Sequence, residues 1–120
     1  MAYDEELANR VRELLADERA VSEMPMFGGL AFLLHGNMSV AVSSQGGLVV
    51  RVGARESDAA AGRPHASVMQ MGKRQMTGWI RVAPEGVKTK RELSAWVRRG
   101  VGFARTLPSK GARGRPRRGA

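Results

Sequence analysis

The sequence predicts an α+β domain in which helices pack against an antiparallel sheet. An amphipathic pattern opens the chain, several short apolar runs broken by glycine follow, and a second amphipathic pattern begins near residue 90. Apolar residues at helical spacing indicate helices at the two ends, and short alternating runs with turn residues indicate hairpins between them. We therefore expect the element order αβββαββα, with the helices covering the sheet.

The first helix is expected over residues 4–18. Asp4 is a suitable N-cap, and Glu5 and Glu6 are favourable in the first turn because they face the positive end of the helix dipole. The apolar residues that recur at helical spacing are Leu7, Val11, Leu14 and Leu15. The opposite, charged face is interpreted as solvated.

A meander of three strands is expected next. The runs are residues 29–34, 38–42 and 48–52, with turns at residues 35–38 and 45–47. The glycines in both turns favour tight connections between antiparallel strands. A short helix over residues 56–61 follows, and Gly62 and Pro64 end it.

A second hairpin and the last helix complete the expected domain. The hairpin strands are residues 68–71 and 76–82, around a turn at residues 72–75. Thr89 and Glu92 match a capping box, which places the helix start near Lys90. The predicted apolar stripe of this helix is Leu93, Trp96, Val97, Val101 and Ala104. Gly100 and Gly102 each weaken the helix by about 1 kcal/mol relative to Ala, which favours a bend or fraying.

Composition limits the classes of function. The 120 residues include no cysteine, which excludes disulfides, thiolate metal sites and cysteine nucleophiles. The acidic N-terminus does not resemble a signal peptide, and no apolar run is long enough to span a membrane. We expect a folded domain over residues 1–108, a disordered basic arm over residues 109–120, and a protein without membrane contact that is cytoplasmic or nucleoid-associated.

The net charge of +9 is unevenly distributed. Residues 1–26 hold seven acids and three arginines, whereas residues 27–109 hold four acids and twelve bases. The last eleven residues add five bases and no acid. Such an excess of positive charge favours anionic partners through long-range attraction, without specifying which partner.

Three motifs, taken in order, resemble the TfoX N-terminal domain family. They are Met26-Phe27-Gly28-Gly29, the segment Gly47-Leu48-Val49-Val50-Arg51-Val52, and Gly78-Trp79-Ile80-Arg81-Val82 before the capped helix. The resemblance covers about residues 4–107. It implies a non-enzymatic regulator related to the TfoX or Sxy competence proteins, which are thought to act in transcription beside a cyclic-AMP receptor protein. In those regulators a second helical domain follows, whereas here the basic arm follows.

The glycine pair after Phe27 is interpreted as a folding signature. Phe27 is expected to anchor in the core, and Gly28 and Gly29 permit close backbone approach or a bulge where the strand begins. A phosphate-binding loop would instead lead into a helix and usually carry a lysine. The sequence therefore does not favour a nucleotide site.

No catalytic, cofactor or metal site is predicted. His35 lies in an expected turn and His65 in a loop, and neither has an acid at metal-ligand spacing. No pattern supports a serine–histidine–acid arrangement, and the adjacent acids of the first helix are interpreted as solvated. We expect that the protein is not an enzyme.

The basic arm is the segment whose chemistry indicates a partner. An Arg-Gly-Arg-Pro core resembles the AT-hook, a peptide that lies in the DNA minor groove, although Ala112 stands where that motif usually has proline. Arginines favour a narrow minor groove, glycine permits close approach, and proline keeps the chain extended. The predicted nucleic-acid-binding residues of the arm are Lys110, Arg113, Gly114, Arg115, Pro116, Arg117 and Arg118.

The last helix carries a basic stripe that leads into the arm. Arg91, Arg98 and Arg105 recur every seven residues, and Lys90 and Arg99 lie nearby. A solvated face is the ordinary interpretation of such a stripe. Because the stripe continues into the arm, Arg98 and Arg105 are included among the predicted phosphate contacts.

The alternative function is a protein-interaction adaptor or homodimer whose tail only adds solubility. Met69 and Met71 alternate on one expected strand, and Met76 lies across the turn. Methionine fills cores and is also common at binding surfaces. Core packing is one interpretation of these residues, and a sheet face used for self-association is the other.

Overall fold

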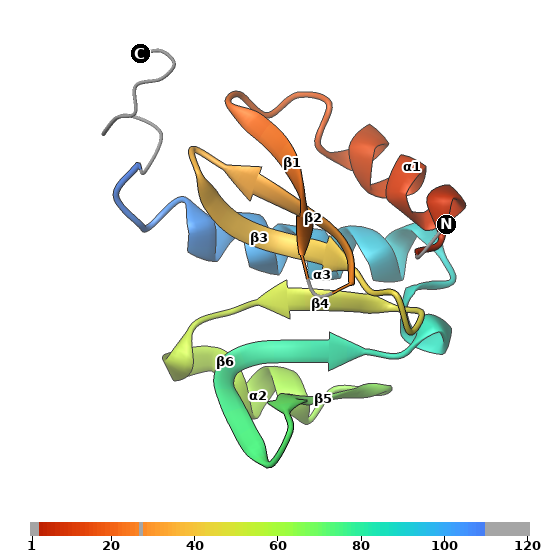
Figure 1. Cartoon of the computed structure of the whole chain (residues 1–120), viewed down its shortest axis with the longest axis vertical. Coiled ribbons are helices and arrows are strands. Elements are labelled where there is room, and N and C mark those ends of the chain that lie inside the picture. Colours follow the sequence, from red (N-terminus) through yellow and green to blue (C-terminus); the bar gives the residue numbers. More distant parts are fainter. Residues whose placement is uncertain (1–2, 27, 110–120) are drawn as a thin grey trace.

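The computed structural model describes residues 3–26 and 28–109, which form a sheet with helices on one side (Figure 1). The helices are α1 (Glu5–Leu14), α2 (Ser57–Ala61) and α3 (Lys90–Ala104). The strands are β1 (Val21–Met26), β2 (Gly29–Leu34), β3 (Asn37–Val42), β4 (Leu48–Arg51), β5 (Ala66–Met71) and β6 (Arg74–Val82). Short 3-10 turns lie at Ala54–Glu56 and Pro84–Val87. The α+β class with an antiparallel sheet packed on helices is confirmed.

The sheet order is β1-β2-β3-β4-β6-β5, and each neighbouring pair is antiparallel. At the β2–β3 turn, His35 and Gly36 have φ values of 52° and 82°. Positive φ at both central positions suits a two-residue hairpin, whose twist then matches that of the strands. The glycine turn expected from the sequence therefore forms there.

Strand β1 is an element that the sequence patterns did not predict. Its residues are partly or fully exposed, and it forms one edge of the sheet with Pro25 near its end. An exposed edge strand has no buried side to produce alternation, and proline is tolerated there because one row of N–H groups is unpaired. Helix α1 was expected to extend to residue 18 but ends at Leu14, so the residues after it are free to lead into β1, which begins at Val21.

An ion pair joins β1 to α1. Arg12 donates from Nε and Nη2 to the two carboxylate oxygens of Glu23, at 2.7 and 2.9 Å. These hydrogen bonds hold the pKa of Glu23 below its ordinary value. The two-pronged geometry fixes the edge strand beside the helix.

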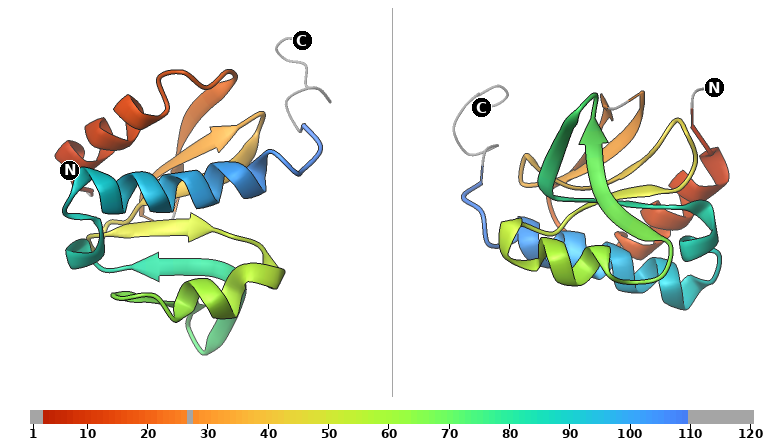
Figure 2. Two further views of the ribbon diagram at one scale, coloured as in Figure 1. Left: turned by 180° about the vertical axis from the view of Figure 1, so that it is seen from behind. Right: turned by 90° about the horizontal axis from the view of Figure 1, so that it is seen from below.

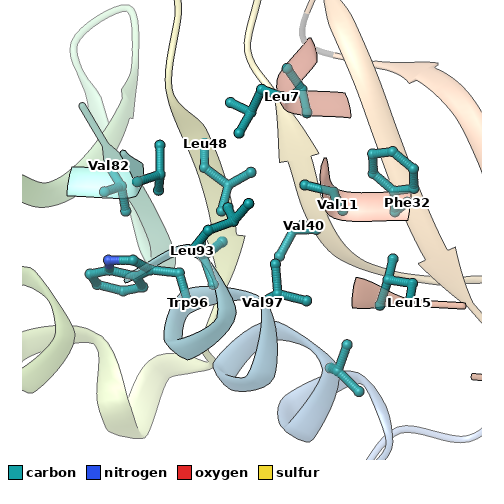
Figure 3. Close-up of a cluster of buried hydrophobic side chains, with 14 of the residues drawn as sticks. Leu7, Val11, Leu15, Phe32, Val40, Leu48, Val82, Leu93, Trp96 and Val97 are labelled. Carbon is teal, nitrogen blue, oxygen red and sulfur yellow. The ribbon is translucent and has the colours of Figure 1, made fainter. Parts of the chain in front are cut away.

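The main core lies between the sheet and helices α1 and α3 (Figure 3). Phe32 of β2, Val40 of β3 and Leu48 of β4 are each fully buried. The predicted apolar stripe of α3 is buried in full: Leu93, Trp96, Val97, Val101 and Ala104. Asp4 caps α1 as expected, since its carboxylate accepts from the backbone N–H groups of Glu6 and Leu7.

A second, smaller cluster lies on the other face of the sheet, where the described chain places no helix (Figure 2). Ala31, Ala41 and Val49 are buried there together with Met38. The partly buried side chains that pack against them are Met26, Leu33, Met69 and Trp79. The strands curve, and the β5–β6 hairpin stands out from the helix layer (Figure 2).

Gly29 explains part of the Gly-Gly motif. A Cβ atom there would lie 1.9 Å from the carbonyl oxygen of Val42 on β3. Gly28 adopts a φ of +73°, which side-chain-bearing residues rarely adopt. The close approach expected from the sequence is confirmed, while Phe27 lies outside the described residues.

Candidate nucleic-acid interface

Helix α3 begins at a complete capping box. The backbone N–H of Glu92 donates to Thr89 Oγ1 at 3.1 Å, and the backbone N–H of Thr89 donates to Glu92 Oε1 at 3.2 Å. This arrangement satisfies N–H groups that otherwise have no partner at a helix start. The predicted start near Lys90 is confirmed.

We predict that the capping box makes the start of α3 sensitive to acid. Hydrogen bonds from the Thr89 backbone and hydroxyl hold the pKa of Glu92 below its ordinary value. A lowered folded-state pKa stabilises the fold above the unfolded pKa of about 4.3, and this contribution is lost as pH falls through the folded value. Glu92→Ala should therefore lower the melting temperature at neutral pH. The difference in melting temperature between the variant and the unchanged protein should become smaller in acid. A constant difference from pH 7 to pH 3 would contradict the prediction.

The outward face of α3 is a shallow basic surface. It is lined by Lys90, Arg91, Ser94, Ala95 and Arg98, which we call the α3 basic face. The helix is pinned to the sheet by its opposite, apolar side, so these side chains point to solvent. Seven residues amount to nearly two helical turns, which places Arg91, Arg98 and Arg105 on one line along the helix.

The cations of this face are available for a partner. Among the residues that the structure describes, no acid forms an ion pair with Lys90, Arg91 or Arg98. Arg98 donates from Nη2 to Ser94 Oγ at 3.2 Å, a neutral neighbour on the same helix. Because no described acid neutralises these charges locally, they can act on an anion that approaches from solution.

Arg105 differs from the other cations of the stripe. It lies at the end of α3 and is exposed, but its guanidinium forms an ion pair with the carboxylate of Glu18. A phosphate that binds Arg105 would therefore compete with Glu18. Sequence reasoning placed Arg98 and Arg105 in one set, whereas the fold leaves only Arg98 without an acidic partner among the described residues.

A second hollow adjoins the α3 basic face and was missed in the sequence. Arg63 and Pro64, which follow α2, lie there beside Arg99 of α3, and Glu92 also lines this hollow. The guanidinium of Arg99 lies over the Trp96 ring, 5.4 Å from its centre, which holds the side chain in place. No spacing pattern links residues 63 and 99, so only the tertiary structure brings these two arginines to one surface.

The segment that follows α3 is held in place by a side-chain hydrogen bond. The side chain of Asn37, buried at the start of β3, donates from Nδ2 to the Pro108 carbonyl at 2.9 Å. This bond holds the segment after α3 against the β2–β3 turn. The predicted tail residues, Lys110, Arg113, Gly114, Arg115, Pro116, Arg117 and Arg118, lie outside the described residues.

Between residues 3 and 109, Phe27 apart, no three His, Asp or Glu side chains are grouped to hold a metal. In the same residues no helix is long and apolar enough to cross a bilayer. His35 and His65 both lie exposed with positive φ, in the turn and loop where the sequence placed them.

A helix-backed antiparallel sheet with a basic outer helix defines a small α+β domain. The family model of the TfoX N-terminal domain matches residues 13–104. The chain belongs to the TfoX N-terminal domain family, as the Met-Phe-Gly-Gly and Gly-Trp-Ile-Arg-Val motifs indicated. Comparison with curated proteins and with solved structures gives no match.

Proposed function

We propose that this protein is a non-enzymatic, TfoX-like regulatory protein that contacts DNA through the α3 basic face and the basic segment after it. The observation that carries the proposal is the row of exposed cations Lys90, Arg91 and Arg98, which have no acidic partner among the described residues. Phosphate contacts of this kind position a protein on a duplex without reading its sequence.

The position of the chain after α3 supports a joint role for helix and tail. The Asn37–Pro108 hydrogen bond holds the start of the tail near the C-terminal end of the helix. Five further bases follow from residue 110 onward. Arg113 and Arg115, around Gly114 and before Pro116, would enter a narrow A·T-rich minor groove, while the α3 basic face would bind the adjacent phosphates.

The test of the helix contribution is DNA binding by the double variant Arg91→Gln/Arg98→Gln. Fluorescence anisotropy with a labelled duplex should show weaker binding, and the slope of log affinity against log salt should become less steep by about 2, from about 0.9 for each lost contact. The matched control is Lys73→Gln/Arg74→Gln, which removes the same charge from the exposed β5–β6 turn. An equal loss in both variants would reduce the binding to general attraction by net charge.

The tail contribution is tested with A·T-rich and G·C-rich duplexes. The unchanged protein should prefer the A·T-rich duplex, because its minor groove is narrow and lacks the guanine amino group. Arg113→Ala/Arg115→Ala should remove this preference. Arg117→Ala/Arg118→Ala should instead lower the affinity for both duplexes by the same factor. Absence of DNA binding at low salt would refute the proposed function.

A further inference from the structure

The β5–β6 hairpin carries a hollow that is independent of the α3 basic face. It has a volume of about 330 Å³ and is lined by Met71, Arg74, Gln75, Met76, Thr77 and Trp79, which we call the methionine hollow. Met71 is 51% exposed, although a large apolar side chain is ordinarily more stable when buried. Trp79 packs at its side against the second core cluster, so the hollow borders the helix-free face of the sheet.

The base of the hairpin is firmly held, while the lining of the hollow is adaptable. Gly78 has a φ of +94°, and its N–H donates to Ser57 Oγ at 3.0 Å. Its carbonyl accepts from the N–H groups of Val52 and Gly53, at 2.8 and 3.1 Å. Strand β6 bends in this part of the chain, and the tip of the hairpin projects away from the helices (Figure 2). Unbranched methionines on such a frame can fit apolar side chains of different shapes.

The surroundings of the hollow are basic. The hairpin residues 66–82 contain no Asp or Glu, but they contain Lys73, Arg74 and Arg81. Arg74 lines the hollow itself, and Lys73 occupies the adjacent turn. Neither forms an ion pair with a described residue. An occupant that combines acidic groups with large apolar side chains would therefore complement both the charge and the lining.

We propose that the methionine hollow binds a segment of a partner protein in which acidic residues are interspersed with leucine or phenylalanine. Thioethers and an indole favour aliphatic and aromatic side chains over phosphates, which distinguishes this surface from the α3 basic face. A second copy of the chain is a poorer occupant. On α1 its exposed acids are Glu5, Glu6 and Glu13, but the neighbouring apolar residues Leu7 and Val11 are buried and cannot enter the hollow.

The proposal is tested by titrating the full-length protein with two short synthetic peptides that contain aspartate, glutamate, leucine and phenylalanine. In one peptide the apolar residues alternate with the acids, and in the other they recur at helical spacing. Trp79 lines the hollow, whereas Trp96, the other tryptophan, is buried in the main core, so binding should change the fluorescence of Trp79. Saturable binding of either acidic peptide supports the proposal. A version with lysine in place of the acids should not bind.

Met71→Ser/Met76→Ser should weaken peptide binding by about tenfold or more, since the free energy of burying even one such side chain corresponds to that factor. Met24→Ser is the matched control, because Met24 is also exposed, at 42%, but lies on the opposite edge strand. Arg74→Gln should weaken binding more than Arg98→Gln on α3. Unchanged melting temperatures show that these surface variants remain folded.

Three results would overturn the proposal: no binding of either acidic peptide, equal binding of the lysine version, or equal loss in the Met24→Ser control. If the protein binds duplex DNA and Met71→Ser/Met76→Ser abolishes that binding, the hollow would be assigned to nucleic acid instead. If sedimentation shows that the unchanged protein is a dimer and that this variant is a monomer, the hollow would be assigned to a second copy of the chain. DNA binding by Arg91→Gln/Arg98→Gln is measured separately, so failure of the peptide arm leaves the proposed function standing.

Discussion

Phe32→Ala is expected to lower the free energy of unfolding by about 3–5 kcal/mol, the range for deleting a fully buried aromatic side chain. Phe32 has no exposed surface and lies in the main core with residues of α1 and the neighbouring strands (Figure 3). Small domains have a total stability of about 5–15 kcal/mol, so the variant should be close to unfolding. Urea denaturation followed by circular dichroism measures the change.

Phe103→Ala is the matched control for this prediction. Phe103 is partly exposed on α3, with the Arg51 guanidinium 5.4 Å from its ring centre. Because the hydrophobic contribution follows the area removed from water, this variant should lose markedly less stability than Phe32→Ala. A similar loss of unfolding free energy in the two variants would contradict the placement of Phe32 in the main core and of Phe103 at its margin.

Gly100→Ala should destabilise the protein by about 1–3 kcal/mol, whereas Gly102→Ala should stabilise it by about 0.5–1 kcal/mol. A Cβ at Gly100 would lie 2.5 Å from the Ser39 carbonyl oxygen and 2.8 Å from Val40 Cγ1. At Gly102 it would meet no atom within 4 Å. The same substitution in the same helix therefore separates helix propensity from contact with the sheet.

The two variants are compared by urea denaturation at one pH. Both gain the same helix propensity, so their difference reports the contact between α3 and β3. Stabilisation by both variants would show that α3 can move away from the sheet without cost. Gly100 also explains why α3 continues through both glycines: the residue permits close packing of helix on strand.

The fold separates two surfaces of different chemistry. The α3 basic face lies in the helix layer, and the methionine hollow lies at the β5–β6 hairpin, beside the helix-free face (Figure 2). The described parts of both surfaces lack ion pairs for their central cations Arg91, Arg98 and Arg74. The two proposals together describe a regulatory adaptor that would bind DNA with one surface and a partner protein with the other.

The methionines show the limit of sequence interpretation at one site. Met38 is buried in the second cluster and Met69 packs against it, which agrees with core packing. Met71 and Met76 instead line an open hollow, so core packing does not describe these two residues. Core packing therefore describes only some of the methionines, because burial of a methionine depends on strand curvature that local spacing does not encode. The use of this sheet face for self-association stays a prediction.

The sequence by itself determined the elements that local chemistry specifies. Thr89 and Glu92 define the start of α3, Asp4 caps α1, and the glycines at residues 36 and 46–47 mark hairpins. The apolar stripe of α3 also follows from helical spacing. These features depend on side chains only a few residues apart, whose interactions are similar in any fold.

Tertiary structure alone decided which distant residues share a surface. It paired β1 with β2 at an edge without alternation, brought Arg63 beside Arg99, and gave Arg105 an acidic partner in Glu18. It also turned Gly100 from a weak point of the helix into a packing contact with Ser39. These outcomes depend on the order and curvature of the strands, which bring together groups that have no fixed spacing along the chain.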